Sequence, residues 1–532
     1  MSLSAAARGA NVLNEVPGRP VTWTTTNVGE AAFPGVPTPL SWSWGWWPTE
    51  RGVRGGFAAL GPLPRALAPA PTDLADRALT LQLGHAALSV DLFRMIGDGT
   101  PGSSAGDVER SWFGSVRPGH ADRPRRLRYP VVAARMPLAG WRVRATMAGL
   151  AVETDRWWRE ATRPRPVDGS EGRALLLESQ LRYERIAVPH VVVGIVAQGL
   201  YDGVRSLCTR VELADLAGVL VPGGAEEGAW LSELWNVAHR GGSLPDFLAA
   251  HGYHGPLEGE LSARSWREDP TPIERLVGAY RAADTEPPAE MFARRAAARV
   301  AAQDEVLGRL PAVARPAARA VLAAARAYMP LRESGRATFL RCYDVARLAS
   351  RAIGEDLAAQ GHLDAADDVF HLTMAEARGA GESFTARVEE RRELRAEYEL
   401  VTLPTLWTGI PEPVSVAGAG GTRSVGEVSG LGVSAGAAEG TVRVVTDPIE
   451  TEDFEPGEVL VCRVTDPSWA ALFYLASAVV TDIGGDMSHG AIVARELGLP
   501  AVVNTGDGTI RLCTGDRVRV DGSTGTVTRL PS

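Results

Sequence analysis

The sequence has few cysteines, and those it has lie far apart. Only four occur among the 532 residues, and no two of them form a Cys-x-x-Cys pair. This pattern argues against a disulfide framework and against a zinc site, and it fits a reducing cytoplasm. We therefore expect a cytoplasmic protein that binds no metal ion of its own.

Long apolar runs and an excess of basic charge are also missing. No stretch approaches 18 uninterrupted apolar residues, and residues 1–20 lack the apolar core of a secretory signal. We therefore expect no membrane span and no secretion signal. The net charge of -9 argues against a nucleic-acid binder, which normally carries a basic face. A chain of this length is too long to fold around one hydrophobic core, so it should form about two to four domains.

Most of the chain is typical of a helical domain. Residues 1–118 are dense in Pro, Gly, Thr and Trp, which predicts loops and short extended pieces. The four tryptophans at 42, 44, 46 and 47 could form an aromatic wall for an apolar ligand or part of the core, and the core is favoured. Beyond residue 122, Ala, Leu and Val recur at helical spacing. This pattern predicts helices over 273–283, 288–307, 312–327, 336–360 and 375–400. We assign residues 1–412 to one mainly helical domain with a loop-rich N-terminal part.

The character of the sequence changes after residue 412. Residues 413–440 are rich in Gly, Ala and Ser, as flexible linkers are. Short β-like runs follow at 441–445, 458–464, 477–482, 500–504 and 516–522, with one clear helix over 490–497. Residues 441–532 should therefore form a small α/β domain on a flexible tether.

One histidine in this small domain has the surroundings that phosphoryl chemistry needs. A strand ends at Asp482, Gly484 and Gly485 follow, and Ser488 stands just before His489 and a helical stretch. Serine is a favoured helix N-cap, which places His489 at the first helical position. Free backbone N–H groups and the positive end of the helix dipole can receive an anion there. The same pattern also fits a plain strand-to-helix connection.

The residues around His489 resemble the mobile phosphohistidine domain of the phosphoenolpyruvate-utilising enzymes. The family motif is matched at Gly484, Gly485, Ser488, His489, Ala491, Ile492, Ala494, Arg495, Glu496, Leu497, Gly498, Pro500, Ala501 and Val502. Met487 stands where the family often has Thr. The resemblance implies that His489 carries the phosphoryl group with help from Ser488 and Arg495. It also implies that Gly484, Gly485 and Gly490 let the backbone contact the phosphate.

The preceding region is similar, more weakly, to the substrate domain of rifampicin phosphotransferase-like proteins. The similarity rests on the segments 25–43, 251–258, 265–270, 331–333 and 367–373, in that order. This similarity suggests an acceptor pocket lined by Asn27, Glu30, Thr38 and Ser43, although a sequence of this kind also fits simple loops. His254 and Glu258 could act as base and orienting group at an acceptor hydroxyl, or they could brace a turn. Arg332 and Glu333 are more typical of a structural ion pair.

No region resembles an ATP-grasp domain, and no Gly-x-x-x-x-Gly-Lys-(Ser/Thr) motif occurs. The resemblance therefore implies that ATP and Mg²⁺ act through a separate ATP-grasp nucleotide-binding protein. Phosphoenolpyruvate as the direct donor remains an alternative.

The sequence thus predicts a multidomain protein in which a swivelling α/β phosphohistidine domain follows a large helical substrate-binding domain. The leading function is phosphoryl transfer from a partner's nucleotide to a small-molecule acceptor. A second hypothesis is a phosphorylation-driven elimination or ligation. A third is a non-catalytic scaffold that retains the fold.

Overall fold

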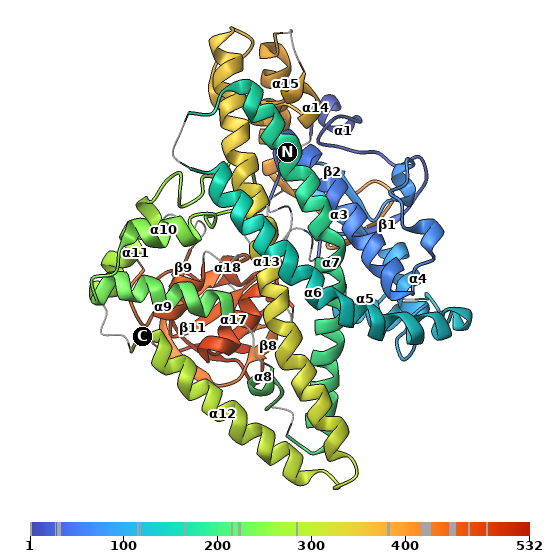
Figure 1. Cartoon of the computed structure of the whole chain (residues 1–532), viewed down its shortest axis with the longest axis vertical. Coiled ribbons are helices and arrows are strands. Elements are labelled where there is room, and N and C mark those ends of the chain that lie inside the picture. The colour runs from blue at the N-terminus through green and yellow to red at the C-terminus, as the bar shows by residue number, and fades with distance from the viewer. Residues whose placement is uncertain are drawn as a thin grey trace. The chain divides into compact units, whose positions relative to one another are not determined.

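The computed structural model describes residues 3–26, 28, 33, 35–113, 116–117, 119–163, 166–213, 216–221, 225–282, 286–379, 383–415, 427–445, 454–465, 469–485 and 488–531 (Figure 1). The chain divides into two compact units. The first unit comprises Met1–Val192, Leu257–Arg264 and Thr338–Ala419, and the second comprises Val193–Pro256, Ser265–Ala337 and Gly420–Ser532. The long helices α7 (Gly169–Arg210) and α13 (Arg315–Ala359) each contribute to both units.

The first unit combines long helices with a small antiparallel sheet. Its helices are α1 (Ala5–Arg8), α3 (Pro39–Leu60), α4 (Val90–Asp98), α5 (Ala105–Phe113), α6 (Tyr129–Ala161), α14 (Met374–Arg378), α15 (Thr385–Glu399) and the 3₁₀ turns η1 (Arg65–Leu67), η2 (Leu74–Asp76), η3 (Arg126–Arg128) and η5 (Ala366–His371). The sheet has the order β2-β3-β1-β5, with β1 (Thr22–Thr24), β2 (Leu79–Gln82), β3 (His85–Ser89) and β5 (Leu406–Thr408). A separate pair joins β4 (Val401–Thr402) to β6 (Val414–Ser415). Strand β5 pairs with β1, although the two strands lie far apart in the sequence.

The tryptophan-rich segment is a helix, so the prediction of loops was wrong there. Helix α3 begins after the N-cap Thr38 with proline at its first position, where the missing N–H costs nothing. Trp44 is fully buried, stacks on Tyr183 at 5.5 Å and meets Tyr343 edge-on at 4.6 Å. Packing of α3 against α7 and α13 therefore outweighs the low helix propensity of its Gly and Pro residues.

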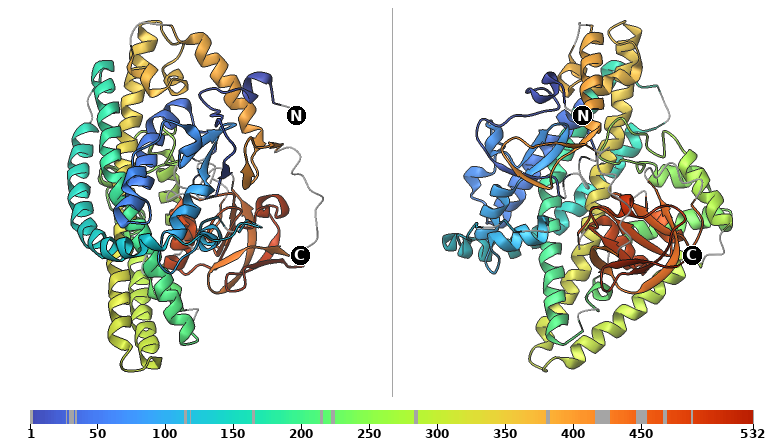
Figure 2. Two further views of the ribbon diagram at one scale, coloured as in Figure 1. Left: turned by 90° about the vertical axis from the view of Figure 1, so that its right-hand side faces the viewer. Right: turned by 180° about the vertical axis from the view of Figure 1, so that it is seen from behind.

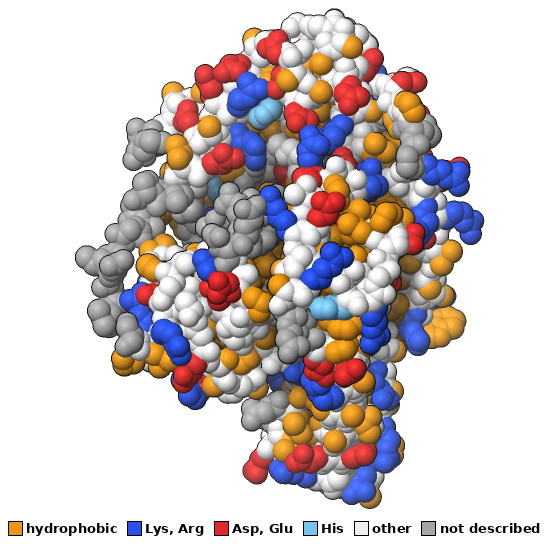
Figure 3. Space-filling model, turned by 90° about the vertical axis from the view of Figure 1, so that its left-hand side faces the viewer, with side chains coloured by type: hydrophobic (Ala, Val, Ile, Leu, Met, Phe, Trp, Pro, Cys, Tyr) orange, Lys and Arg blue, Asp and Glu red, His pale blue; other side chains and the backbone are white. Residues whose placement is uncertain are grey.

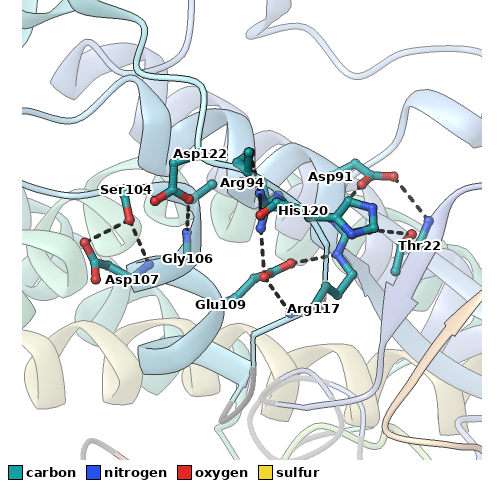
Figure 4. A network of polar contacts seen from close by, with 12 residues as sticks. Thr22, Asp91, Arg94, Ser104, Gly106, Asp107, Glu109, Arg117, His120 and Asp122 are labelled. Atoms are coloured by element: carbon teal, nitrogen blue, oxygen red, sulfur yellow. Dashed lines mark hydrogen bonds and ion pairs between the residues drawn. The ribbon is translucent and has the colours of Figure 1, made fainter.

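A partly buried ion-pair network fixes the segment that precedes α6 (Figure 4). The guanidinium of Arg117 donates to Glu109 at 2.7 Å, to Thr22 at 2.7 Å and to Asp91 at 2.9 Å. Arg94 pairs with the other oxygen of Glu109 at 2.8 Å. Because both oxygens of the Glu109 carboxylate are paired with arginines, the network ties this segment to β1, α4 and α5.

The second unit joins helices to an eight-stranded sheet. Its helices are α8 (Ala217–Leu220), α9 (Ala225–His239), α10 (Leu244–His251), α11 (Thr271–Ala282), α12 (Pro288–Arg309), α16 (Ala470–Leu475), α17 (His489–Leu497) and α18 (Gly508–Arg511). The sheet order is β7-β14-β13-β9-β10-β11-β12-β8. Its strands are among the orange and red arrows in the right-hand view of Figure 2. These strands are β7 (Val428–Ser429), β8 (Leu431–Ser434), β9 (Ala437–Val444), β10 (Val459–Cys462), β11 (Ala478–Thr481), β12 (Ala501–Val503), β13 (Arg517–Asp521) and β14 (Thr526–Arg529). Strands β9 to β12 run parallel, and the outer strands pair antiparallel.

Alternating side chains give this sheet two buried faces. Val459, Val461 and Val480 belong to a core made by the sheet itself. Leu460 and Val479 point to the opposite face, as the two-residue period of a strand requires. That face shares one hydrophobic core with α9, α11, α16 and α17. The C-terminal sheet and the helices α9 and α11 therefore fold as one unit.

The sheet begins before residue 441. Strands β7 and β8 and the start of β9 lie within the range 413–440 assigned to a linker, and residues 416–426 of that range lie outside the described part. The predicted strands near 458, 477, 500 and 516 and the helix near 490 are confirmed. The helical and α/β character of the two parts is confirmed as well.

Helix α7 is long and apolar enough, by length and composition, to cross a membrane, and 33% of its most apolar window is buried. Core helices of soluble proteins meet the same criterion, so the expectation of no membrane association stays a prediction. On the face drawn in Figure 3, basic and acidic side chains are interspersed.

Candidate functional site

The histidine singled out by the sequence stands at the start of a helix, at the carboxyl end of a buried strand. Strand β11 ends at Thr481, and α17 begins at His489. Ser488 is the N-cap, and its Oγ accepts the N–H of Ala491 at 3.4 Å, as predicted. The His489 side chain lies outside the described part of the structure, so its place rests on the backbone alone. That backbone puts it where unpaired helical N–H groups and the helix dipole favour an anion.

Two of the three predicted phosphate-binding glycines have a structural reason to be glycine. Gly484 has a φ of 155°, and a Cβ there would lie 3.1 Å from Val503 and 3.2 Å from the Ser488 Oγ. A Cβ on Gly490 would lie 2.6 Å from the Thr465 Oγ1, so the first turn of α17 packs closely on the segment after β10. Gly485 has nothing within 4 Å of such a Cβ. Their contact with a phosphate stays a prediction.

Asp482, which the sequence did not suggest as a site residue, fixes the loops around this helix start. Its buried carboxylate accepts the Thr505 hydroxyl at 2.9 Å, the Thr509 N–H at 3.0 Å and the Thr509 hydroxyl. Its backbone N–H donates to the Cys462 carbonyl at 3.2 Å. Asp482 therefore joins the end of β10 to the segments that follow β11 and β12. The only signal in the sequence was an acidic residue at the end of a buried strand.

Arg495 lies away from the start of the helix. It follows His489 by six residues, which places it roughly 9 Å along the axis and on another face. Its guanidinium donates to the Val433 carbonyl at 3.2 Å and lies over the Tyr201 ring at 5.3 Å. The structure does not bring Arg495 to the N-terminus of α17, and its catalytic role stays a prediction.

Helix α12 holds the other end of α17. The Arg295 guanidinium donates to the Arg495 carbonyl at 3.1 Å and occupies the space over Gly498. Burial lowers the pKa of Arg295, while the nearby Glu496 carboxylate raises it in part. Arg299 lies 3.8 Å from Glu496. Two arginines thus bind the negative end of the helix that carries the histidine.

The predicted acceptor-pocket residues have structural partners where they are described. Asn27 and Glu30 lie outside the described residues. Thr38 caps α3 and donates to the buried Glu260 carboxylate at 2.7 Å. Ser43 donates to the Leu40 carbonyl at 3.2 Å and accepts the Met374 N–H at 2.7 Å. Their part in binding an acceptor stays a prediction.

Glu260 and Arg347 form a buried polar centre that the sequence did not indicate. The Glu260 carboxylate also accepts the Ser41 hydroxyl at 2.6 Å and the Ser262 N–H at 3.0 Å. The fully buried Arg347 donates to the carbonyls of Glu258 at 2.8 Å and Glu260 at 3.1 Å. This centre ties residues 257–262 to α3 and α13.

His254 and Glu258 are both buried but fall in different units. The His254 ring lies 4.3 Å from the Tyr253 ring and 5.4 Å from the Trp266 ring. The Glu258 carbonyl accepts from Arg347 as described above. Their action as base and orienting group stays a prediction. The expected Arg332–Glu333 ion pair is present at 4.0 Å.

Within the described residues, no three His, Cys, Asp or Glu side chains gather in a way that could hold a metal ion.

Two family models match the chain. Residues 454–525 match the PEP-utilising enzyme mobile domain, and residues 188–333 match the rifampicin phosphotransferase fourth domain. The first match covers the strands and helices around His489. The second covers the helices of the second unit from the end of α7 into α13.

Curated relatives match over part of their length. Rifampicin phosphotransferase of Streptomyces sviceus is 37% identical over 203 residues, which are 38% of this chain and 23% of the relative. An uncharacterized protein of Mycobacterium tuberculosis is 35% identical over 282 residues, 53% of this chain and 30% of the relative. A prodigiosin synthesizing transferase of Serratia marcescens is 32% identical over 297 residues, 53% of this chain and 32% of the relative. The chain thus spans between 23% and 32% of the length of these relatives. Residues 454–525 are therefore similar to the PEP-utilising enzyme mobile domain, and part of the chain is similar to proteins named rifampicin phosphotransferase.

Proposed function

We propose that His489 accepts a phosphoryl group from a nucleotide and passes it to a hydroxyl of a small-molecule acceptor. The observation that carries this proposal is the placement of His489 at the capped N-terminus of α17 within a segment that matches the PEP-utilising enzyme mobile domain. Histidine is a suitable covalent carrier because an imidazole nitrogen is nucleophilic near neutral pH.

The donor is ATP bound with Mg²⁺ on a separate ATP-grasp nucleotide-binding protein. An imidazole nitrogen of His489 attacks the β-phosphorus of ATP, the bond between the α- and β-phosphates breaks and AMP leaves. Water cleaves the bond between the β- and γ-phosphates and releases phosphate, so that one phosphoryl group stays on His489. The metal, when bound on that partner, neutralises phosphate charge during the transfer. This chain contributes the nucleophile and the N-terminal N–H groups of α17 that face the bound phosphoryl group.

In the second step an acceptor hydroxyl attacks phosphorus, the N–P bond breaks and the imidazole is restored. Dividing one difficult transfer into two easier ones is the usual advantage of covalent catalysis. The proton of the hydroxyl needs a base, for which His254 remains the candidate. The acceptor site belongs to the mainly helical part of the chain.

The test is acceptor phosphorylation by the full chain with ATP, Mg²⁺ and a candidate ATP-grasp protein. We expect His489→Ala to abolish turnover, and the partner alone to form no product. His254→Gln should lower transfer to the acceptor while leaving the phosphorylation of His489 unchanged. Unchanged turnover in His489→Ala would disprove the proposal.

A phosphorylation-driven ligation or elimination is the second candidate, because one relative is named a synthesizing transferase rather than a phosphotransferase. In that case the acceptor phosphate is an intermediate. Product without retained phosphate, formed only when His489 is present, would favour this candidate. A stable phosphoprotein that discharges to no acceptor would instead favour a scaffold.

A further inference from the structure

Helix α6 carries an apolar stripe on its outer side. Six of its residues follow one another at alternating spacings of four and three: Ala134, Leu138, Trp141, Ala145, Ala148 and Val152, here called the α6 stripe. All six are exposed, with Trp141 at 70%, Val152 at 63% and Leu138 at 44%. Leu127, one heptad before Ala134, is 93% exposed.

The stripe is distinct from the face by which α6 joins the core. The buried residues of α6 include Val132, Val143, Met147 and Trp158. At about 100° per residue, these lie on the side of the helix opposite the stripe. Packing in the core of the first unit therefore accounts for the apolar residues on the inner face of α6, but not for those of the α6 stripe. An apolar row of this length on a helix surface marks an interaction site.

The width and spacing of the stripe fit another helix. A row at positions a and d of a heptad is the narrow seam along which two helices pack. The small side chains of Ala134, Ala145 and Ala148 leave room on either side of Leu138 and Trp141 for larger side chains of a partner helix. A membrane surface would instead need a broad apolar face, and α6 has used its other side in the core.

The flanks of the stripe are positively charged. Arg142 and Arg144 are exposed and lie on either side of Trp141, about 80° from the centre of the stripe. Between Arg123 and Val152 the sequence contains seven arginines and no acidic residue, although the chain has a net charge of -9. Glu153, the first acidic residue after this segment, pairs with Arg182 at 3.1 Å and Arg185 at 2.9 Å.

These charges disfavour a second copy of the chain as the occupant. In an antiparallel pair of α6 helices that overlap at Trp141, Arg142 and Arg144 of one copy would lie beside those of the other. In a parallel pair no acidic residue would meet them, because residues 123–152 contain none. Like charges at the flanks of a helix pair are repulsive, whereas acidic residues there would pair with them.

We propose that the α6 stripe docks an amphipathic helix of a partner protein, with an apolar seam flanked by aspartate or glutamate. This inference goes beyond the proposed function and does not rest on it. The apolar seam supplies packing, and the arginines select the partner's charge and set the register.

The test uses the full chain and two labelled helical peptides of about four heptads, with leucine at a and d and either glutamate or lysine at e and g. Fluorescence anisotropy should show binding of the glutamate peptide and at least tenfold weaker binding of the lysine peptide. Trp141→Glu should weaken binding of the glutamate peptide at least tenfold, and Arg142→Glu should weaken it and reduce its salt dependence. Val313→Glu, which changes another apolar residue that is 88% exposed, is the matched control and should bind like the wild type. Circular dichroism checks that each variant is folded.

Three results would overturn the proposal. The first is equal binding of both peptides, or of neither. The second is binding to vesicles containing about a quarter phosphatidylserine that Trp141→Glu abolishes while the glutamate peptide does not bind, which would make a membrane the occupant. The third is dimerisation in sedimentation velocity that Trp141→Glu abolishes, which would make a second copy the occupant.

Discussion

Replacing Gly498 with alanine should weaken the contact of Arg295, on α12, with α17, the helix that begins at His489. Gly498 ends α17 in the left-handed conformation, with a φ of 67°, and an added Cβ would lie 1.0 Å from an Arg295 nitrogen. The left-handed backbone alone costs an alanine about 1 kcal/mol. Displacing Arg295 also removes its 3.1 Å hydrogen bond to the Arg495 carbonyl, worth about 1.5–3 kcal/mol for a charged donor. We expect Gly498→Ala to destabilise α17 by about 2.5–4 kcal/mol.

A double-mutant cycle separates the two contributions. In an Arg295→Ala background the space over residue 498 is open, so Gly498→Ala should cost only about 1 kcal/mol there. Gly506→Ala is the matched control, because Gly506 has a φ of 75° and nothing within 4 Å of an added Cβ. It should also cost about 1 kcal/mol.

The assay is hydrogen exchange of the α17 amides, since global unfolding of a chain with two units does not give a single free energy. An equal cost of Gly498→Ala with and without Arg295 would refute the reasoning. A cost no larger than that of Gly506→Ala would refute it as well.

Three further predictions follow from single side chains. Ser488→Ala should destabilise the first turn of α17 by about 1 kcal/mol, because the Ala491 N–H loses the hydroxyl that accepts it. Ser488→Thr should keep this hydrogen bond, so only Ser488→Ala should show faster hydrogen exchange of the first-turn amides. Burial alone would raise the pKa of Glu376, but hydrogen bonds from Arg391 and Thr373 outweigh burial and hold its pKa at about 2, below the usual 4.5. Its stabilising effect is therefore full above pH 4.5 and lost as the pH falls towards 2, so thermal melts of Glu376→Gln should lack this acid-dependent step and a step of wild-type size would contradict the assignment. Burial raises the pKa of Cys208 to about 11 and that of Cys342 to about 12. Iodoacetamide at pH 8 should therefore modify the half-buried Cys513 first, as mass spectrometry of peptides would show. Equally fast labelling of Cys342 would argue against its burial.

Local signals in the sequence were enough to predict several strands and the helix α17 of the C-terminal α/β region. Its strands alternate between two buried faces, and the cap at Ser488 depends on residues only three positions apart. Those patterns are short, so they can be read without knowing the fold.

Elements whose structure depends on tertiary packing were predicted less well from the sequence. Helix α3 contains Pro48 and several glycines, which favour loops, yet its packing on α7 and α13 makes it helical. The helices expected over 312–327 and 336–360 form one continuous α13, because Pro330 is accommodated within it. Such effects depend on neighbours that the local sequence does not contain.

The buried centre of Glu260 and Arg347 could not be predicted for a related reason. It joins Thr38 and Ser41 to residues more than 200 positions away. Asp482 likewise acts through Thr505 and Thr509, which follow the next strand. Only the fold brings these side chains together, whereas the motif at His489 is contiguous.

The most direct test of the central claim is detection of phosphohistidine on the purified chain after incubation with ATP and Mg²⁺, with and without candidate ATP-grasp proteins. We expect acid-labile label at His489 that requires the partner and is absent in His489→Ala. Label that persists in His489→Ala, or no label from ATP or phosphoenolpyruvate under any condition, would contradict the account.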